Sequence, residues 1–478
     1  MITNSAISAA SRTVGFICGQ SVPSKPHRQT PNRCPAAGQV GLESYRRRGE
    51  PRPSWLTTMY TMRTPVDGSA YSFASANLAK LASVPHYLWG AFRSSGVRRD
   101  PMLWVIGSDF GLSDGGWAFY QAASRLDPAP RLVWQVNGER QRAQAIAAGV
   151  AWVDRESNEG FELALRAGVI AVTHGLGDVN RYAQRGALIV QLWHGSPLKK
   201  LNLDSPSVLN LGAAGRIPGL AALMRAMYKA GTKSISVFPV ACPEFVTSMC
   251  TAFALSPKQV LSIGEPRGDQ LFTGTPAELR ARSRALWEQT IADLGDRRLI
   301  LQAPTWRDGE VDPTIPSEAD WARLEAFCER TDSVLVIRPH PKSVGDYHYS
   351  SARVHVIDGS RQPEIMPLLW GVDVLVTDYS SILFDYSVTE HPILYLAPDL
   401  EHYEATRGLY IDYTDICGPD GLLRTWDEVI ARMDGWTDPA AQAVEKAQTR
   451  ATFDRFITHR DGLNSERTVA RVLELLAR

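Results

Sequence analysis

The stretch VDVLVTDYSSILFDYSVTEHPILYLA, residues 372–397, decides the fold. It opens with an apolar, β-branched run, passes through a short polar turn into the helical run ILFDYSV, and closes with a second apolar run, ILYLA. Strands that alternate with helices in this way pair in parallel, with helices covering the sheet. Residues 372–397 therefore predict one unit of a parallel α/β sheet.

The same alternation runs through most of the chain. Strand-like runs lie at 102–107, 131–136, 168–173, 187–192 and 234–240, and again at 298–303, 333–338, 353–357, 372–377 and 393–397. Two such series predict an α/β protein with two Rossmann-type parallel-sheet domains that face each other. We expect an N-terminal domain over 101–255, a C-terminal domain over 256–438, and helices over 439–478 that pack back across the domains.

The composition is that of a soluble globular protein: of 478 residues, 44% are hydrophobic, 21% are charged, and the net charge is zero. No apolar run reaches the roughly 18–20 residues that span a bilayer, and no signal peptide is recognisable. The six cysteines are scattered without a CxxC pair, which favours a reducing cytoplasm over a disulfide scaffold or zinc ribbon. Beyond residue 58 acidic groups outnumber basic ones, so no nucleic-acid partner is expected.

The first hundred residues differ from the rest. Residues 1–58 hold eight Lys or Arg, two acidic residues and six prolines, without a periodic apolar pattern, which predicts a disordered basic tail. Because Met59 and Met62 are alternative starts, it stays open whether this tail belongs to the native protein. Residues 59–100 read as an amphipathic helical lead-in. The basic, aromatic stretch 73–99 fits a membrane-surface helix and, equally well, a helix packed on the domain by its apolar face.

Four polar clusters follow predicted strands, and ligands of open α/β sheets bind at such strand ends. The first is QLWHGSPLKKL, residues 191–201, which places His194 at a strand end, followed by a glycine, a hydroxyl and two lysines. A histidine there suits a general base, since its ordinary pKa is about 6.5. A satisfied histidine in a strand-to-helix turn explains this segment, taken alone, equally well.

The second and third clusters are cationic. Arg307 follows a predicted strand directly, and its planar fork matches phosphate geometry. Arg338, His340 and Lys342 lie within five residues at the end of the next strand, and two prolines fix the direction of the histidine. A cationic edge of this kind suits a diphosphate, although a solvated turn is the alternative.

The fourth cluster, Thr377-Asp378-Tyr379-Ser380-Ser381, lies between a strand and a helical run. Hydroxyls and free amides at a helix N-terminus form a ready phosphate site, whereas N-capping alone would explain only one of these residues. The chain has no GxGxxG after a strand, no P-loop and no Asp-x-Asp. Phosphate charge would therefore be met by helix N-termini, arginine, lysine and histidine, without a metal.

Taken together and in this order, the clusters resemble the CDP-glycerol glycerophosphotransferase family, whose members build teichoic-acid and related capsular polymers. The matching stretches are QLWHGSPLKKL, APTWRDGE, VIRPHPKS and the long segment from VDVLVTDYSS to GLYIDY, with GEPRGDQLF at 264–272 and the terminal DGLNSERTVARVLELL. The likeness covers about residues 101–475. Ser196 stands where the family usually has threonine, and Gln302 where an aromatic residue often stands.

The resemblance implies a GT-B-like fold, in which two Rossmann-type domains face a central cleft and the C-terminal one binds the nucleotide. It implies that His194 is the acceptor-side base and that His340 and Arg338 stabilise the diphosphate and the leaving CMP. The other nucleotide and phosphate ligands would be Arg307, Asp378, Ser380 and Ser381. Candidate acceptor contacts are Ser196, Lys199 and Lys200. No cofactor and no metal is implied.

The implied reaction is attack of an acceptor hydroxyl on the β-phosphorus of CDP-glycerol, with release of CMP. The acceptor would be a lipid-linked glycan or polyol phosphate, as in teichoic-acid-like or capsular polymer synthesis. Two alternatives stay open: a transferase that uses CDP-ribitol or another nucleotide-activated polyol or sugar, and a non-catalytic nucleotide-binding protein. We expect a cytoplasmic protein attached peripherally to the inner face of the cell membrane.

Overall fold

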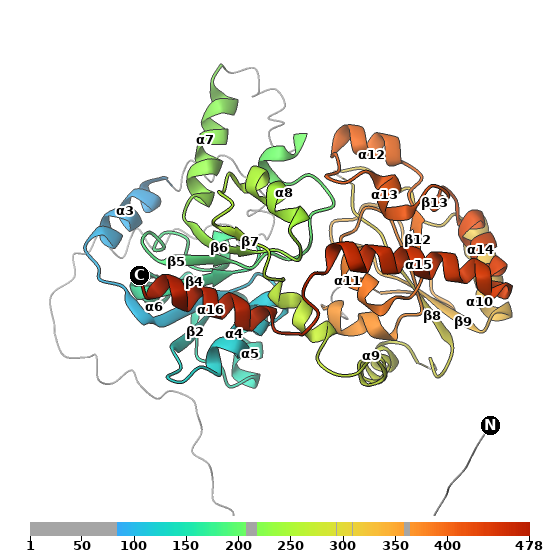
Figure 1. Cartoon of the computed structure of the whole chain (residues 1–478), viewed down its shortest axis with the longest axis horizontal. Coiled ribbons are helices and arrows are strands. Elements are labelled where there is room, and N and C mark those ends of the chain that lie inside the picture. Colours follow the sequence, from blue (N-terminus) through green and yellow to red (C-terminus); the bar gives the residue numbers. More distant parts are fainter. Residues whose placement is uncertain (1–83, 207–217, 293, 308, 358–363) are drawn as a thin grey trace, which may run out of the picture. The chain divides into compact units, whose positions relative to one another are not determined.

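Two parallel sheets organise the chain (Figure 1). The computed structural model describes residues 84–206, 218–292, 294–307, 309–357 and 364–478. The strands of the first sheet are, in spatial order, β3 (Trp152–Asp154), β2 (Arg131–Val136), β1 (Asp100–Gly107), β4 (Ala167–Val172), β5 (Leu188–Gln191), β6 (Ile235–Pro239) and β7 (Val260–Leu261). The strands of the second are β10 (Val354–Val356), β9 (Ser333–Ile337), β8 (Arg298–Ala303), β11 (Val374–Thr377), β12 (Ile393–Leu396) and β13 (Leu422–Leu423).

Neighbouring strands pair in parallel throughout both sheets. Both sheets also follow the same doubly wound order, in which the sequence of strands reverses once. This confirms the predicted α/β class with two Rossmann-type sheets. Each strand-like run is a strand, whereas β3, β7 and β13, short strands at the sheet edges, were not predicted.

Burial explains why the central strands form where they do. All six residues of β4, AGVIAV, are buried, and so are all five of β9, SVLVI. Strands of a parallel sheet are covered on both faces, so a continuous run of small and β-branched residues is the pattern that this environment selects.

Helices connect the strands. Those that precede or connect strands of the first sheet are α3 (Val84–Ser95), α4 (Asp114–Ser124), α5 (Gly138–Ala147), α6 (Asn158–Arg166), α7 (Leu220–Thr232) and α8 (Glu244–Phe253). The helices associated with the second sheet are α9 (Pro276–Thr290), α10 (Glu318–Arg330), α11 (Ile382–Tyr386), α12 (Leu400–Thr406), α13 (Tyr413–Cys417), α14 (Trp426–Asp434) and α15 (Pro439–Phe456). Capping boxes start α9, α10 and α14, where a Ser or Thr and an acidic residue three positions later satisfy each other's free amides.

The two C-terminal helices go to different sheets. Helix α15 packs against β12, whereas α16 (Asn464–Leu476) packs against α4 and the 3₁₀ helix η7 (Pro266–Leu271) (Figure 1). The Asp269 carboxylate accepts the amides of Asn464 and Ser465 at 2.7 and 2.8 Å, which fixes the start of α16. The last helix thus completes the core of the first sheet, although the second sheet precedes it in sequence.

The predicted tail at 1–58 lies outside the described residues, as does most of the lead-in at 59–100. Of the stretch 73–99, the structure describes α3 and the residues that follow it. None of the described helices combines the length and the apolar character that crossing a bilayer requires.

Candidate functional site

The strand order locates the two places where a ligand is expected. It reverses between β1 and β4 in the first sheet and between β8 and β11 in the second. In doubly wound sheets, ligands bind outside the carboxyl ends of the strands at such a switch point. The second and fourth clusters follow β8 and β11 directly, so the structure places them at the switch point of the second sheet.

His194 lies in a sharp turn after β5. Trp193 adopts a left-handed backbone conformation with φ of 59°, and its side chain is buried, while the next side chain, that of His194, is exposed. The rings of these two neighbours stack at a centroid distance of 4.2 Å. The turn therefore anchors one aromatic ring in the core and turns the histidine outward.

Gly195 brings the first and fourth clusters into contact. A Cβ atom on this glycine would lie 2.8 Å from the Ser381 hydroxyl oxygen, so with a side chain there either the serine or one of the two turns would have to move. The following residues pair with a loop of the second half of the chain: the amide of Lys200 donates to Gly408 O, and the amide of Tyr410 donates to Leu198 O, both at 2.9 Å. The segment at 191–201 thus lies against the residues that follow β11 and α12.

His174, two residues after the end of β4, joins the site, although the sequence analysis did not single it out. Its ring stacks on that of His194, with centroids 4.7 Å apart and planes 19° apart. Its Nδ1 lies 2.9 Å from the Thr173 hydroxyl, which donates in turn to the buried carboxylate of Asp178 at 3.1 Å. His174 could have been recognised as a candidate from the sequence, because it directly follows the strand run at 168–173. The structure shows that this strand end lies at the switch point of the first sheet.

The surroundings of His194 favour its neutral form. Loss of solvation beside the neighbouring rings is the largest cause of a pKa well below 6.5. The charge that His174 carries when protonated and the charges of Arg267 and Lys199 lower the pKa further. A neutral imidazole at ordinary pH can accept a proton, as a general base must.

His340 is also neutral, and its tautomer is fixed. The backbone amide of Lys342 donates to its Nδ1 at 3.1 Å, so the proton of the neutral ring resides on Nε2. Desolvation, followed by the charges of Lys199, Lys342 and Arg338, lowers its pKa to about 3. Lys199 thus acts electrostatically on both His194 and His340, which ties the first cluster to the third.

Arg307 is held by carboxylates within the second half of the chain. Its guanidinium makes two parallel hydrogen bonds to Asp399, at 2.7 and 2.8 Å, and a third to Asp378 at 2.9 Å. It also lies over the stacked rings of Tyr379 and Tyr403, about 5 Å from each centroid. Only 3% of the residue is exposed. This arrangement orients the turn after β11. That Arg307 also contacts a phosphate directly stays a prediction.

Asp378 is fully buried, and its carboxylate serves the same local network. It accepts the amide of Thr305 at 2.8 Å, while Tyr413 donates its hydroxyl to the Asp378 carbonyl at 2.9 Å. Burial raises the pKa of Asp378, although Arg307 opposes this. Ser380 and Ser381 are half-buried at the start of α11, so of the fourth cluster these two hydroxyls are the ones that reach accessible surface.

A second buried arginine, Arg267, joins elements of both halves, and sequence reasoning did not single it out. Its Nε donates to Asp114 at 3.1 Å and its Nη1 to Asp385 at 2.9 Å, and the Glu265 carboxylate lies 3.7 Å away. The sequence did contain a pointer to Arg267, because the residue lies in GEPRGDQLF, one of the segments that resemble the family. No role was assigned to that segment.

Glu265 is also the hydrogen-bond partner of Ser196. The Ser196 hydroxyl is buried and donates to Glu265 at 3.2 Å, so it faces the junction between the halves of the chain. Lys199 and Lys200 are half-buried in the strip that pairs with residues 408–410. Among the residues that the structure describes, no group of His, Cys, Asp and Glu could hold a metal ion.

Two doubly wound parallel sheets, with polar strand ends that converge from both, define a GT-B-like two-domain α/β protein. The chain belongs to the CDP-Glycerol:Poly(glycerophosphate) glycerophosphotransferase family, whose sequence model matches residues 89–474. This confirms the resemblance found in the four clusters.

Characterised relatives agree with this assignment. The chain is 28% identical over 225 residues to the teichoic acid ribitol-phosphate polymerase TarL of Staphylococcus aureus, which covers 46% of this chain and 38% of TarL. It is 29% identical over 300 residues to the teichoic acid glycerol-phosphate transferase of the same species, covering 58% of this chain and 69% of the relative. It spans only 38–60% of the length of the first three curated relatives.

A solved structure has the same fold. The wall teichoic acid polymerase TagF superimposes with a TM-score of 0.65 at 20% identity, covering 84% of this chain and 97% of that structure.

Proposed function

We propose that the protein transfers glycerol phosphate from CDP-glycerol to a hydroxyl of a lipid-linked glycan or polyol-phosphate acceptor in teichoic-acid-like or capsular polymer synthesis. The acceptor oxygen forms a bond to the β-phosphorus, the bond from that phosphorus to the bridging oxygen breaks, and CMP leaves with the bridging oxygen. Family membership supports this reaction class. The observation that carries it for this chain is the contact of Gly195 with Ser381, which joins the histidine turn to the expected phosphate turn.

The residues fit complementary roles. Neutral His194 accepts the proton of the attacking hydroxyl, and neutral His340 donates its Nε2 proton in a hydrogen bond to the diphosphate and the leaving CMP. Ser380 and Ser381 bind phosphate oxygens, and Arg338 adds positive charge beside His340. Arg307 and Asp378 position the turn that carries the serines. Lys199 and Lys200 contact the anionic acceptor.

Release of CMP from purified protein tests the donor. We expect turnover with CDP-glycerol in a panel that also contains CDP-ribitol and sugar nucleotides. Release from a different donor alone would overturn the glycerol assignment. CDP-ribitol is the second candidate, because one of the matched relatives is named a ribitol-phosphate polymerase. Binding without turnover for every donor and acceptor would instead support the non-catalytic alternative.

We also propose peripheral attachment to the inner face of the cell membrane. On α3, Tyr87, Leu88 and Phe92 expose 44%, 68% and 69% of their surface. Arg93 is engaged by Glu162 at 2.9 Å, and Arg99 donates to four backbone carbonyls. The exposed apolar face of α3, more than Arg93 and Arg99, therefore supports contact with lipid.

Co-sedimentation with anionic liposomes tests this location. Leu88→Ser combined with Phe92→Ser should reduce the bound fraction. Ile146→Ser is the matched control, because Ile146 on α5 is a comparably exposed aliphatic residue at 61%. Equal binding of the α3 variant and the wild type would refute the role of this helix.

A further inference from the structure

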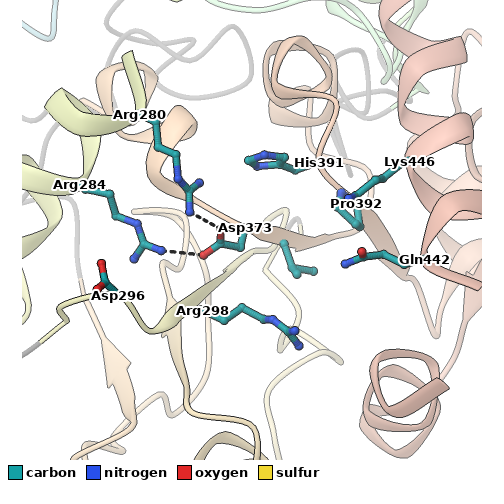
Figure 2. Close-up of a pocket in the computed structure, with 10 residues that line it drawn as sticks. Arg280, Arg284, Asp296, Arg298, Asp373, His391, Pro392, Gln442 and Lys446 are labelled. Carbon is teal, nitrogen blue, oxygen red and sulfur yellow. Dashed lines mark hydrogen bonds and ion pairs between the residues drawn. The ribbon is translucent and has the colours of Figure 1, made fainter. Parts of the chain in front are cut away.

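The second sheet carries a cationic pocket at the edge opposite to the proposed active site. The pocket has a volume of about 260 Å³ and lies at the amino ends of β8, β11 and β12. Its walls come from α9, α15 and these strand ends, and its lining side chains include Arg280, Arg284, Arg298, Asp373, His391 and Lys446 (Figure 2). Since β11 has four residues, the pocket and the serines after β11 lie on the order of 13 Å apart along the strand.

Asp373 organises one wall of this pocket. Its two carboxylate oxygens accept hydrogen bonds from Arg280 at 2.6 Å and Arg284 at 2.8 Å (Figure 2). The amide of Leu299 donates to the second oxygen at 2.7 Å. One carboxylate therefore balances two guanidinium groups. The arrangement fixes both arginines at the pocket and leaves positive charge in excess.

Two further cations face the same space. In the described part of the chain, neither Arg298 nor Lys446 has a carboxylate partner, and Asp296 is the only other acidic residue in the lining. The lining thus holds more positive than negative side chains, which an anion in the pocket would balance.

We propose that this pocket binds a phosphate group. Arg298 and Lys446 supply the uncompensated charge. Arginine forks and lysine ammonium groups are the usual protein ligands of phosphate oxygens. His391 forms part of the wall, with its Nδ1 donating to the Val372 carbonyl at 2.8 Å. The phosphate group is supplied either by a small free anion or by a phosphodiester of an anionic polymer chain.

Titration of the full chain with inorganic phosphate tests the proposal. Thermal denaturation over a phosphate series at constant ionic strength yields the dissociation constant. We expect Arg298→Gln combined with Lys446→Gln to weaken binding roughly tenfold, because two charge-assisted contacts are lost. Lys258→Gln, which removes an exposed cation outside the pocket, should bind as the wild type does. Equal binding by all three proteins would overturn the proposal.

Two additions separate the outcomes further. Lys446→Gln alone changes only an exposed position of α15 and should weaken binding roughly threefold, so it serves if the double variant does not fold. Glycerol phosphate oligomers and CMP are titrated beside inorganic phosphate. A larger loss for the oligomer in the pocket variant identifies the polymer as the source, and an equal loss identifies a small anion. Neither titration requires turnover, so failure of the proposed enzymatic function would leave this result intact.

Discussion

His194 and His340 both follow a parallel strand and both are neutral, but their surroundings differ in a way that suits the opposite tasks proposed for them. His340 has its tautomer fixed, because the Lys342 amide donates to Nδ1 and leaves the proton on Nε2. His194 is positioned mainly by rings, with His174 on one side and Trp193 beside it. The comparison teaches that a strand-end histidine becomes a donor or an acceptor through its second nitrogen and its neighbours, not through its position alone.

The largest expected effect comes from removing the acceptor of the pair. His194→Ala should lower kcat about 10³-fold, within the range of general-base catalysis, because no group remains to take the hydroxyl proton. The affinity for CDP-glycerol should stay close to the wild-type value, since we propose that His194 acts on the acceptor and not on the donor. Steady-state CMP release and donor titration measure the two quantities. His348→Ala, at a side chain that is 95% exposed, is the matched control, and turnover of His194→Ala at the wild-type rate would remove the base assignment.

Removal of His340, the proposed hydrogen-bond donor, should lower kcat less than removal of His194. His340→Ala should lower kcat roughly 10²-fold, the cost of losing one preorganised donor to developing charge. His340→Gln should recover part of that loss, because its amide NH₂ can donate from a position similar to that of Nε2. If Gln is as slow as Ala, donation from Nε2 is not what His340 contributes.

The sequence was sufficient to predict the strands and the strand ends of this pair. Buried parallel strands are continuous apolar runs, so the strands before both histidines were readable, as was their common edge. Arg307 shows the limit. A strand-end arginine fits a phosphate and a carboxylate equally well, and only the fold reveals that Asp399, 92 residues later, occupies its fork. Arg267 joins Asp114 to Asp385 in the same non-local way.

His174 sharpens the comparison, because His340 has no histidine stacked on it among the described residues. When protonated, His174 lowers the pKa of His194. His174→Gln should therefore raise that pKa and move the acid limb of the kcat profile to higher pH, with only a few-fold loss of rate at pH 8. The kcat profiles of the His340 variants, measured over the same pH range, provide the comparison. An unmoved acid limb in His174→Gln would show that the stacked ring does not tune the base.

Glu265 should give the smallest effect on turnover and a clear effect on stability. Desolvation raises its pKa from 4.5 to about 7, although Arg267 opposes this, so the folded protein holds a proton that the unfolded chain releases. The stability that comes from this proton is complete below pH 4.5 and is lost as the pH rises through 7. Glu265→Gln cannot ionise and still accepts from Ser196, so at pH 8 it should be more stable than the wild type by roughly 1–3 kcal/mol.

Denaturant unfolding at pH 5 and pH 8 measures the difference. Equal stabilities at pH 8, or a Gln variant weaker at both pH values, would mean that Glu265 is ionised in the folded state and that Arg267 needs its charge.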